Sequence, residues 1–226
     1  MSFWSLLIVI WRRDRWLERR TRTGAFGFFF MGLAMLFLLG LIADPASLRE
    51  PSLLAGLMWT AVALGGGWSL WHGLQLEMED GAVHGLFHSP AEPGSIFLAR
   101  VIVQWVKTFP LTILLAFLLL FLLGEGWPPG PFTLLASLAL GLVGVTGAGM
   151  LLAYLTFPAR GRQLVFPLSF MPLSAPVLVA GTELVRTALE TSSLLHTGPW
   201  WRLLFVYDGV MLAFGWLMVG AVVEEG

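Results

Sequence analysis

Six long apolar stretches constrain this chain more than any other feature of its sequence. They lie near residues 25–42, 52–73, 101–124, 132–155, 164–181 and 203–222. A helix needs on the order of 20 residues to cross a bilayer, and each stretch approaches or exceeds that length. Backbone groups cannot stay unpaired in lipid, and these runs are too long for the alternating strands of a membrane barrel. We therefore expect an all-α membrane protein, with six transmembrane helices in one domain over residues 1–226.

The composition supports a membrane protein and excludes several kinds of chemistry. Hydrophobic residues make up 57% of the 226 residues and charged residues only 12%, against about 25% charged in an average soluble domain. The chain has no cysteine, which excludes disulfides, thiolate metal sites and a cysteine nucleophile. The net charge of −1 gives no reason to expect a nucleic-acid partner.

The N-terminal segment, MSFWSLLIVIWRRDRWLERR, is apolar first and basic afterwards. A signal peptide has the opposite order, so we expect this segment to remain in the mature protein. Its apolar part is too short to span the membrane. We expect residues 1–24 to form an interfacial elbow helix on the inner surface, with Trp4, Trp11 and Trp16 at headgroup depth.

The distribution of positive charge predicts the orientation. If the N-terminus is inside, the inner segments carry ten Lys and Arg residues: six between Arg12 and Arg22, together with Arg100, Lys107, Arg160 and Arg162. The outer segments carry three: Arg49, Arg186 and Arg202. Positive residues are enriched in cytoplasmic loops, so both termini are expected in the cytoplasm.

Two of the predicted spans have unusual packing signals. In the fourth, Gly141, Gly144 and Gly147 form a small-residue seam, which suits either close packing within the chain or a subunit interface. In the fifth, Pro167, Pro172 and Pro176 remove backbone donors and are expected to kink or break the helix. Such a helix should face protein or a cavity, and it is a candidate pathway element.

The motifs that are missing exclude most enzyme classes. The only lysine is Lys107, preceded by Val106, so the chain has no phosphate-binding GxxxxGK[ST] loop and no ATPase site of its own. The HExxH and GxSxG signatures are also absent. We expect Lys107 to extend toward the inner interface, Asp208 to lie near the outer headgroups, and the two not to pair. No catalytic residue is predicted.

The histidines suggest metal or heme, but simpler interpretations are favoured. His84 and His88 could share one helix face, yet they lack a clear third ligand, and a solvated or partner-facing loop explains them. His196 precedes Trp200 and Trp201, which suits either heme ligation or an aromatic belt. We favour the belt and keep His196 as a weak heme candidate. The segment 182–202 is expected to include a short amphipathic helix at the outer surface.

The longest predicted inner connection, residues 74–100, contains LEMEDGAVHGLFHSP. It begins as an extension of the second span, turns at Asp80-Gly81 and continues as a short helix. A polar connection of this kind is suited to dock a separate ATPase subunit and to transmit its movement to the membrane helices. The predicted coupling residues are Glu77, Glu79, Asp80, Gly81 and His84.

The run QLEMEDGAVHGLFHSPAEPGSIFLARVIVQWVKTFPLTILL resembles the heme exporter protein B (CcmB) family, with its Asp-Gly core, Pro90, Arg100 and Trp105. The proline-rich LVFPLSFMPLSAPVLVA is similar to the fifth helix of that family, through Pro172-Leu173-Ser174 and Pro176. The chain departs from the family pattern at Val83, His84 and Gly85. The resemblance covers nearly the whole chain.

This resemblance implies a homodimeric ABC-2 type permease of the bacterial inner membrane, active in cytochrome c maturation. The implied partners are an ATP-binding subunit (CcmA-like), a heme-handling membrane protein (CcmC-like), a small membrane subunit (CcmD-like) and a heme chaperone (CcmE-like). Heme is then a possible substrate and not a covalently bound cofactor, and ATP acts only through the partner subunit. The alternatives are an ABC-2 permease for another amphiphile, such as a lipid or drug, and a membrane enzyme or scaffold without an ATPase partner.

Overall fold

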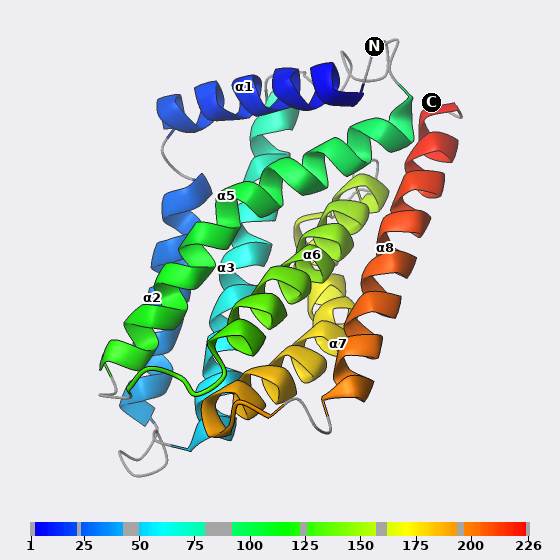
Figure 1. The fold of residues 1–226 in the computed structure, drawn as a ribbon. Coiled ribbons are helices and arrows are strands. Elements are labelled where there is room, and N and C mark those ends of the chain that lie inside the picture. The colour runs from blue at the N-terminus through cyan, green and yellow to red at the C-terminus, as the bar shows by residue number, and fades with distance from the viewer. Residues whose placement is uncertain are drawn as a thin grey trace.

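The computed structural model describes residues 3–21, 24–42, 50–79, 92–122, 126–156, 162–193 and 197–224. Within these ranges the chain forms helices and no strand, which confirms the predicted all-α class. The helices are α1 (Phe3–Thr21), α2 (Gly24–Ile42), α3 (Pro51–Glu79), α5 (Pro93–Leu122), α6 (Pro131–Thr156), α7 (Arg162–Glu190) and α8 (Gly198–Glu224). All but α1 form a bundle, and α1 lies across one end of it (Figure 1).

Five of these helices contain a segment that is long and apolar enough to cross a membrane. The segments are Pro51–Gly73, Pro93–Phe121, Pro131–Thr156, Leu164–Glu190 and Gly198–Val219. They correspond to five of the six predicted spans. The remaining predicted span lies in α2, whose apolar part, Phe26–Ile42, is shorter than the others.

Proline begins three of the membrane-length helices. Pro51, Pro93 and Pro131 are the first residues of α3, α5 and α6. The first N–H groups of a helix have no intrahelical acceptor, so the missing N–H of proline costs little there, and its fixed φ angle already suits the helix. In each case the carbonyl of the residue before the proline accepts the first helical hydrogen bond. These prolines set where the long helices start.

Helix α1 is amphipathic and packs on the start of α5. Leu6 is buried against Ile96 and Ala99 of α5, whereas Trp4 and Trp16 are 73% and 59% exposed. Both chain termini lie at the same end of the bundle as α1 (Figure 1). A helix with tryptophans on its free face, lying across the end of a bundle, has the form that an interfacial elbow requires.

The main core is built around Trp59 of α3, which is 1% exposed. Its indole lies directly beside Gly141 of α6 and Gly181 of α7, and a methyl group at either glycine would overlap the ring. Gly144 and Gly147 of α6 likewise face side chains of α7 and α8. The predicted glycine seam is therefore filled by side chains of this chain, which is the first of the two interpretations that the sequence allowed.

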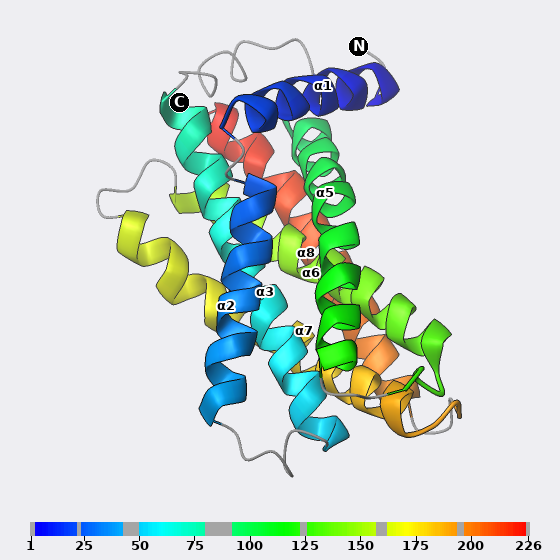
Figure 2. The same ribbon diagram turned by 90° about the vertical axis from the view of Figure 1, so that its left-hand side faces the viewer.

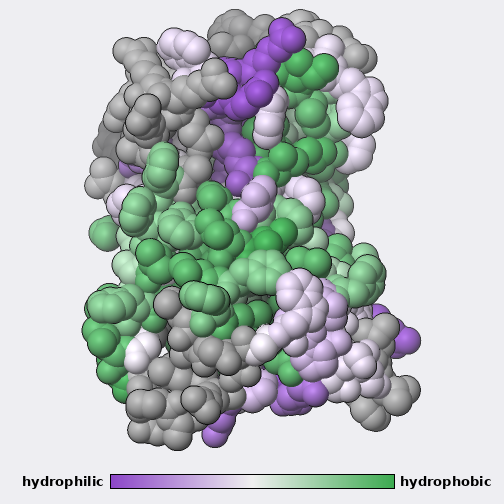
Figure 3. Space-filling model, turned by 60° about the vertical axis from the view of Figure 1, so that its left-hand side comes forward, coloured by the Kyte–Doolittle hydropathy of each residue, from purple (hydrophilic) through white to green (hydrophobic). Residues whose placement is uncertain are grey.

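Large apolar side chains also cover much of the outside. On α8 the exposed apolar residues include Phe205, Val206, Val210, Phe214 and Leu217. Figure 3 shows a hydrophobic band around the middle of one face, with hydrophilic residues toward both ends. A soluble monomer rarely exposes so large an apolar surface, whereas a bilayer covers it.

The outer segment differs from the expected separate helix over residues 182–202. Its first part continues α7 to Glu190, and α8 already begins at Gly198. Arg186 supports this extension of α7, because it bonds Glu183 at 2.7 Å and Glu190 at 2.9 Å along the same helix face. These i,i+3 and i,i+4 pairs stabilise a polar last turn that the apolar pattern alone places outside the span.

Candidate functional site

The end of α3 and the start of α5, which residues 80–91 join in the sequence, lie at the same end of the bundle as α1 (Figures 1 and 2). Glu77 and Glu79 belong to the last turn of α3, so this helix does extend beyond the predicted span, and their side chains are outside the described part of the structure. Asp80, Gly81 and His84 also lie outside the described residues. Of the predicted coupling region, the structure therefore describes only the two flanking parts, the end of α3 and the start of α5.

The start of α5 is fastened to α8 by Trp216. The indole Nε1 of Trp216 donates a hydrogen bond to Glu92 Oε1 at 3.2 Å. Gly94 lies directly against the same indole, and a Cβ at this position would overlap the ring. One turn further on, Phe97 packs on Gly215 in the same way. The connection between α3 and α5 therefore leads directly into a close contact with α8.

Lys107 of α5 faces α1, which lies across one end of the bundle (Figure 1). Its Nζ lies 2.5 Å from Asp14 Oδ2 of α1, and the two side chains are 18% and 28% exposed. Hydropathy did not single out Asp14 as the partner, because this aspartate stands in a segment with six arginines. As predicted, Lys107 does not pair with Asp208.

Helix α7 remains continuous through Pro167, Pro172 and Pro176, so none of these prolines breaks it. The helix runs obliquely to the bundle (Figure 2). In the turn before Pro176, the carbonyl of Leu173 accepts a hydrogen bond from Tyr207 Oη of α8 at 2.5 Å. A neighbouring helix thus supplies a donor beside a proline, as the sequence argument requires.

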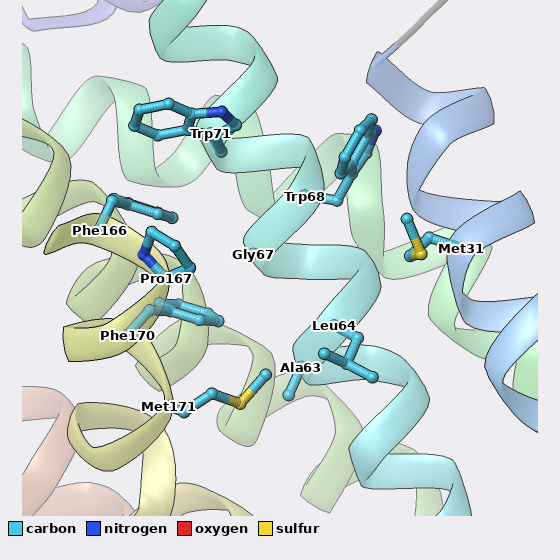
Figure 4. A pocket seen from close by; sticks show the side chains of 10 residues that line it. All are labelled: Met31, Ala63, Leu64, Gly67, Trp68, Trp71, Phe166, Pro167, Phe170 and Met171. Carbon is cyan, nitrogen blue, oxygen red and sulfur yellow. The ribbon is translucent and has the colours of Figure 1, made fainter. Parts of the chain in front are cut away.

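An apolar pocket of about 310 Å³ lies between α2, α3 and α7. Figure 4 shows its lining: Met31, Ala63, Leu64, Gly67, Trp68, Trp71, Phe166, Pro167, Phe170 and Met171. The ring of Phe166 lies 5.4 Å from that of Trp71 and stacks on Phe170 at 5.6 Å. The lining has no carboxylate or imidazole, so it offers ring faces and shape to a flat apolar ligand, with the thioethers of Met31 and Met171 as its potential metal ligands.

Asp208 is not at the outer headgroups, which corrects the prediction. It lies ten residues into α8, about 15 Å along the axis, and is only 6% exposed. It faces Gly144 of α6, where a Cβ would come within 2.5 Å of Oδ1 and 2.6 Å of Val177 of α7. The hydropathy pattern could not show that α8 directs this carboxyl inward. The available signal was an acid inside one apolar span, Asp208, and a glycine seam in another, at Gly144.

Histidine, aspartate and glutamate side chains do not gather into a metal site in the described residues. His84, His88 and His196 all lie outside the described ranges, so the heme candidate His196 has no structural context here. The described residues thus contain three separate features: the contact of Trp216 with the start of α5, the aromatic pocket, and the buried carboxyl of Asp208.

Comparison with known proteins gives the family. The family model described as CcmB protein matches residues 4–224. The chain belongs to the CcmB protein family. It is 29% identical over 189 residues to heme exporter protein B of Pseudomonas aeruginosa, covering 84% of this chain and 83% of that protein. It is also 29% identical over 177 residues to heme exporter protein B of Rhodobacter capsulatus, covering 76% of this chain and 81% of that one.

Proposed function

We propose that this chain is the permease subunit of an ABC transporter for cytochrome c maturation in the bacterial inner membrane. It would couple ATP hydrolysis by a separate subunit to heme export, or to release of a heme-loaded chaperone. The observation that carries the proposal is the CcmB match over residues 4–224, which spans nearly all of the described helices. Two relatives that share most of their length with this chain are named heme exporter protein B.

We propose further that the chain crosses the membrane six times, with α2 as the shortest crossing and α1 along the inner surface. Both termini would then be cytoplasmic. Three observations support this orientation: the termini share one end of the bundle (Figure 1), α1 lies across that end with exposed tryptophans, and ten of thirteen positive residues belong to the inner segments. The positive-inside tendency favours the same direction.

The connection between α3 and α5 is the proposed contact with the ATP-binding subunit. Glu77, Glu79, Asp80, Gly81 and His84 are the residues we assign to it. Glu77 and Glu79 lie in the last turn of a continuous 29-residue helix, and Asp80, Gly81 and His84 follow it in the sequence. This supports the assignment, because a displacement of that end moves the whole of α3. The other end of the connection is fastened to α8 through Trp216, so a displacement there would reach α8 as well as α5.

Alanine substitution of Glu79-Asp80-Gly81 tests this contact. We expect normal membrane insertion, loss of the ATP-binding subunit on co-purification, and loss of cytochrome c maturation. Glu50→Ala is the matched control, since it removes an exposed carboxylate next to the opposite end of α3. If the triple variant retains its ATPase and supports maturation, the coupling assignment is wrong.

A pull-down of the full chain in mild detergent tests the wider proposal. We expect an ATP-binding subunit (CcmA-like), heme-handling (CcmC-like) and small (CcmD-like) membrane subunits, and a second copy of this chain. A deletion strain should fail to mature cytochrome c. If an ATPase co-purifies with the chain but the deletion strain still matures cytochrome c, the chain is an ABC-2 permease for another amphiphile. If no ATPase is recovered, the chain is not a permease of this type.

A further inference from the structure

The carboxyl group of Asp208 lies in the middle of the bundle without a hydrogen-bond partner. Both Oδ1 and Oδ2 are buried and unpartnered among the described residues. Asp208 meets Gly144 and Val177 near the middle of α6 and α7, about 20 Å from either end of those helices. The carboxyl is therefore far from both membrane surfaces if the helices span the bilayer.

Ionisable groups on the neighbouring helices do not neutralise this carboxyl. Arg186 of α7 is bound to Glu183 and Glu190, and Lys107 of α5 is bound to Asp14. Arg202 of α8 is exposed and about 9 Å away along the helix axis. The remaining described charged or titratable side chains on α5 to α8 are Arg100 of α5, which lies over the ring of Tyr154, Tyr154 itself, and Tyr207 on the Leu173 carbonyl. Glu92, just before α5, is bound to Trp216.

A metal cation does not fit this place. Calcium requires six to eight oxygen ligands, and magnesium requires six. Where Asp208 Oδ1 approaches α6, Gly144 has no side chain, and the α7 side chain closest to that point is Val177, which has no oxygen. The hydroxyl of Ser174 lies one turn from Val177, fully buried and also without a partner, and adds one oxygen at most. A proton needs only one oxygen, so it is the ligand that suits this set of groups.

We infer that Asp208 is an intramembrane proton-binding site, occupied while α6, α7 and α8 are packed as in this structure. An ionised carboxylate at this depth would need water, a cation or several donors. The close approach of Gly144 closes the side of the carboxyl that faces α6, and neither Gly144 nor Val177 supplies a side-chain donor. Loss of the proton therefore requires α8 to separate from α6, and proton binding favours their contact.

Carbodiimide labelling tests the site directly, because dicyclohexylcarbodiimide adds to a protonated carboxyl in an apolar environment and leaves a stable N-acylurea. The experiment uses the full wild-type chain in membranes, with peptide mass mapping after labelling near neutral pH. We expect modification at Asp208 and none at Glu183, whose carboxylate is bound to Arg186. Labelling of Glu183 with Asp208 unmodified would overturn the inference, as would no labelling at either.

The pH dependence of stability gives an independent readout. If the folded chain holds a proton that the unfolded chain releases, its unfolding temperature falls as pH rises from mildly acidic to alkaline. Asp208→Asn is neutral at every pH and nearly the same size, so its unfolding temperature should depend less on pH. Glu183→Gln is the matched control and should retain the wild-type slope. Equal slopes for wild type and Asp208→Asn would contradict the inference.

Both readouts concern this chain alone and need neither heme nor an ATPase. If Asp208→Asn fails to fold, wild-type labelling still decides between the outcomes. A failure of the permease proposal in the pull-down would leave the result at Asp208 unchanged, so the two can be judged separately.

Discussion

At the scale of single residues, Trp216 and Gly94 make the contact through which α5 meets α8. The indole ring lies on the glycine, and its Nε1 donates to Glu92, two residues earlier in the chain. Only a residue without a side chain allows this approach. The contact is therefore sensitive to a single methyl group, which makes it a sharp point for mutation.

We predict that Gly94→Ala destabilises the protein by about 1–3 kcal/mol, the usual cost of overpacking. The added Cβ would overlap the Trp216 ring and displace it from Glu92. Thermal unfolding in detergent measures the effect. Gly73→Ala is the control, since its Cβ would meet no atom within 4 Å inside α3 and should stabilise slightly. Equal stability of the two variants would show that the contact is not tight.

Tyr207 offers a second residue-scale test, on the hydrogen bond beside Pro176. Tyr207→Phe removes the donor to the Leu173 carbonyl and should destabilise the protein by about 1–2 kcal/mol, because the hydroxyl is the only group lost. Val206→Ala, on the neighbouring exposed position, should have a smaller effect. Denaturant unfolding followed by tryptophan fluorescence compares them. An effect no larger than that of Val206→Ala would rule out a role for this bond.

At the scale of elements, α1 is held to α5 by an apolar contact and by one ion pair. Leu6 packs on Ile96 and Ala99, and Asp14 bonds Lys107 about three turns further along α5. These two contacts fix both the position and the direction of α1 across the bundle. Its tryptophans are thereby left on the free face, where a membrane surface can receive them.

The ion pair should contribute about 1 kcal/mol, since both side chains are only partly exposed. We expect Asp14→Asn and Lys107→Met each to lower the free energy of unfolding by about that amount. The double variant should lose less than the sum of the two, which a double-mutant cycle in low salt measures. Strict additivity would mean that the pair is absent in solution.

At the scale of the whole molecule, the proposed orientation places residues 80–91 and 191–193 on opposite sides of the membrane. The chain has no cysteine, so a single introduced cysteine reports its own location. We predict that Ser192→Cys reacts with an impermeant maleimide in intact spheroplasts, and that His88→Cys reacts only after the membrane is permeabilised. The reverse pattern would invert the topology. Labelling of both positions from outside would contradict the three crossings, α5, α6 and α7, that we propose between them.

Much of this organisation was predictable from the sequence because it depends on local hydropathy. Long apolar runs must be helical in lipid, and the structure has membrane-length helices at five of the six predicted spans, with a shorter apolar helix at the first. The distribution of charge predicted that both termini lie on one side, and they do lie at one end of the bundle (Figure 1). The CcmB resemblance followed from the motifs around Asp80 and Pro172, and the family match confirms it.

The inward direction of Asp208, the partner of Lys107 and the clasp of Trp216 on Gly94 were decided only by the tertiary structure. Each depends on the rotation of one helix against another that is distant in sequence. An apolar helix surrounded by lipid and protein has no strong amphipathic pattern to set that rotation, because both environments accept the same side chains. Hydropathy determines which segments enter the membrane, whereas close packing at glycines and a few polar contacts determines which faces meet.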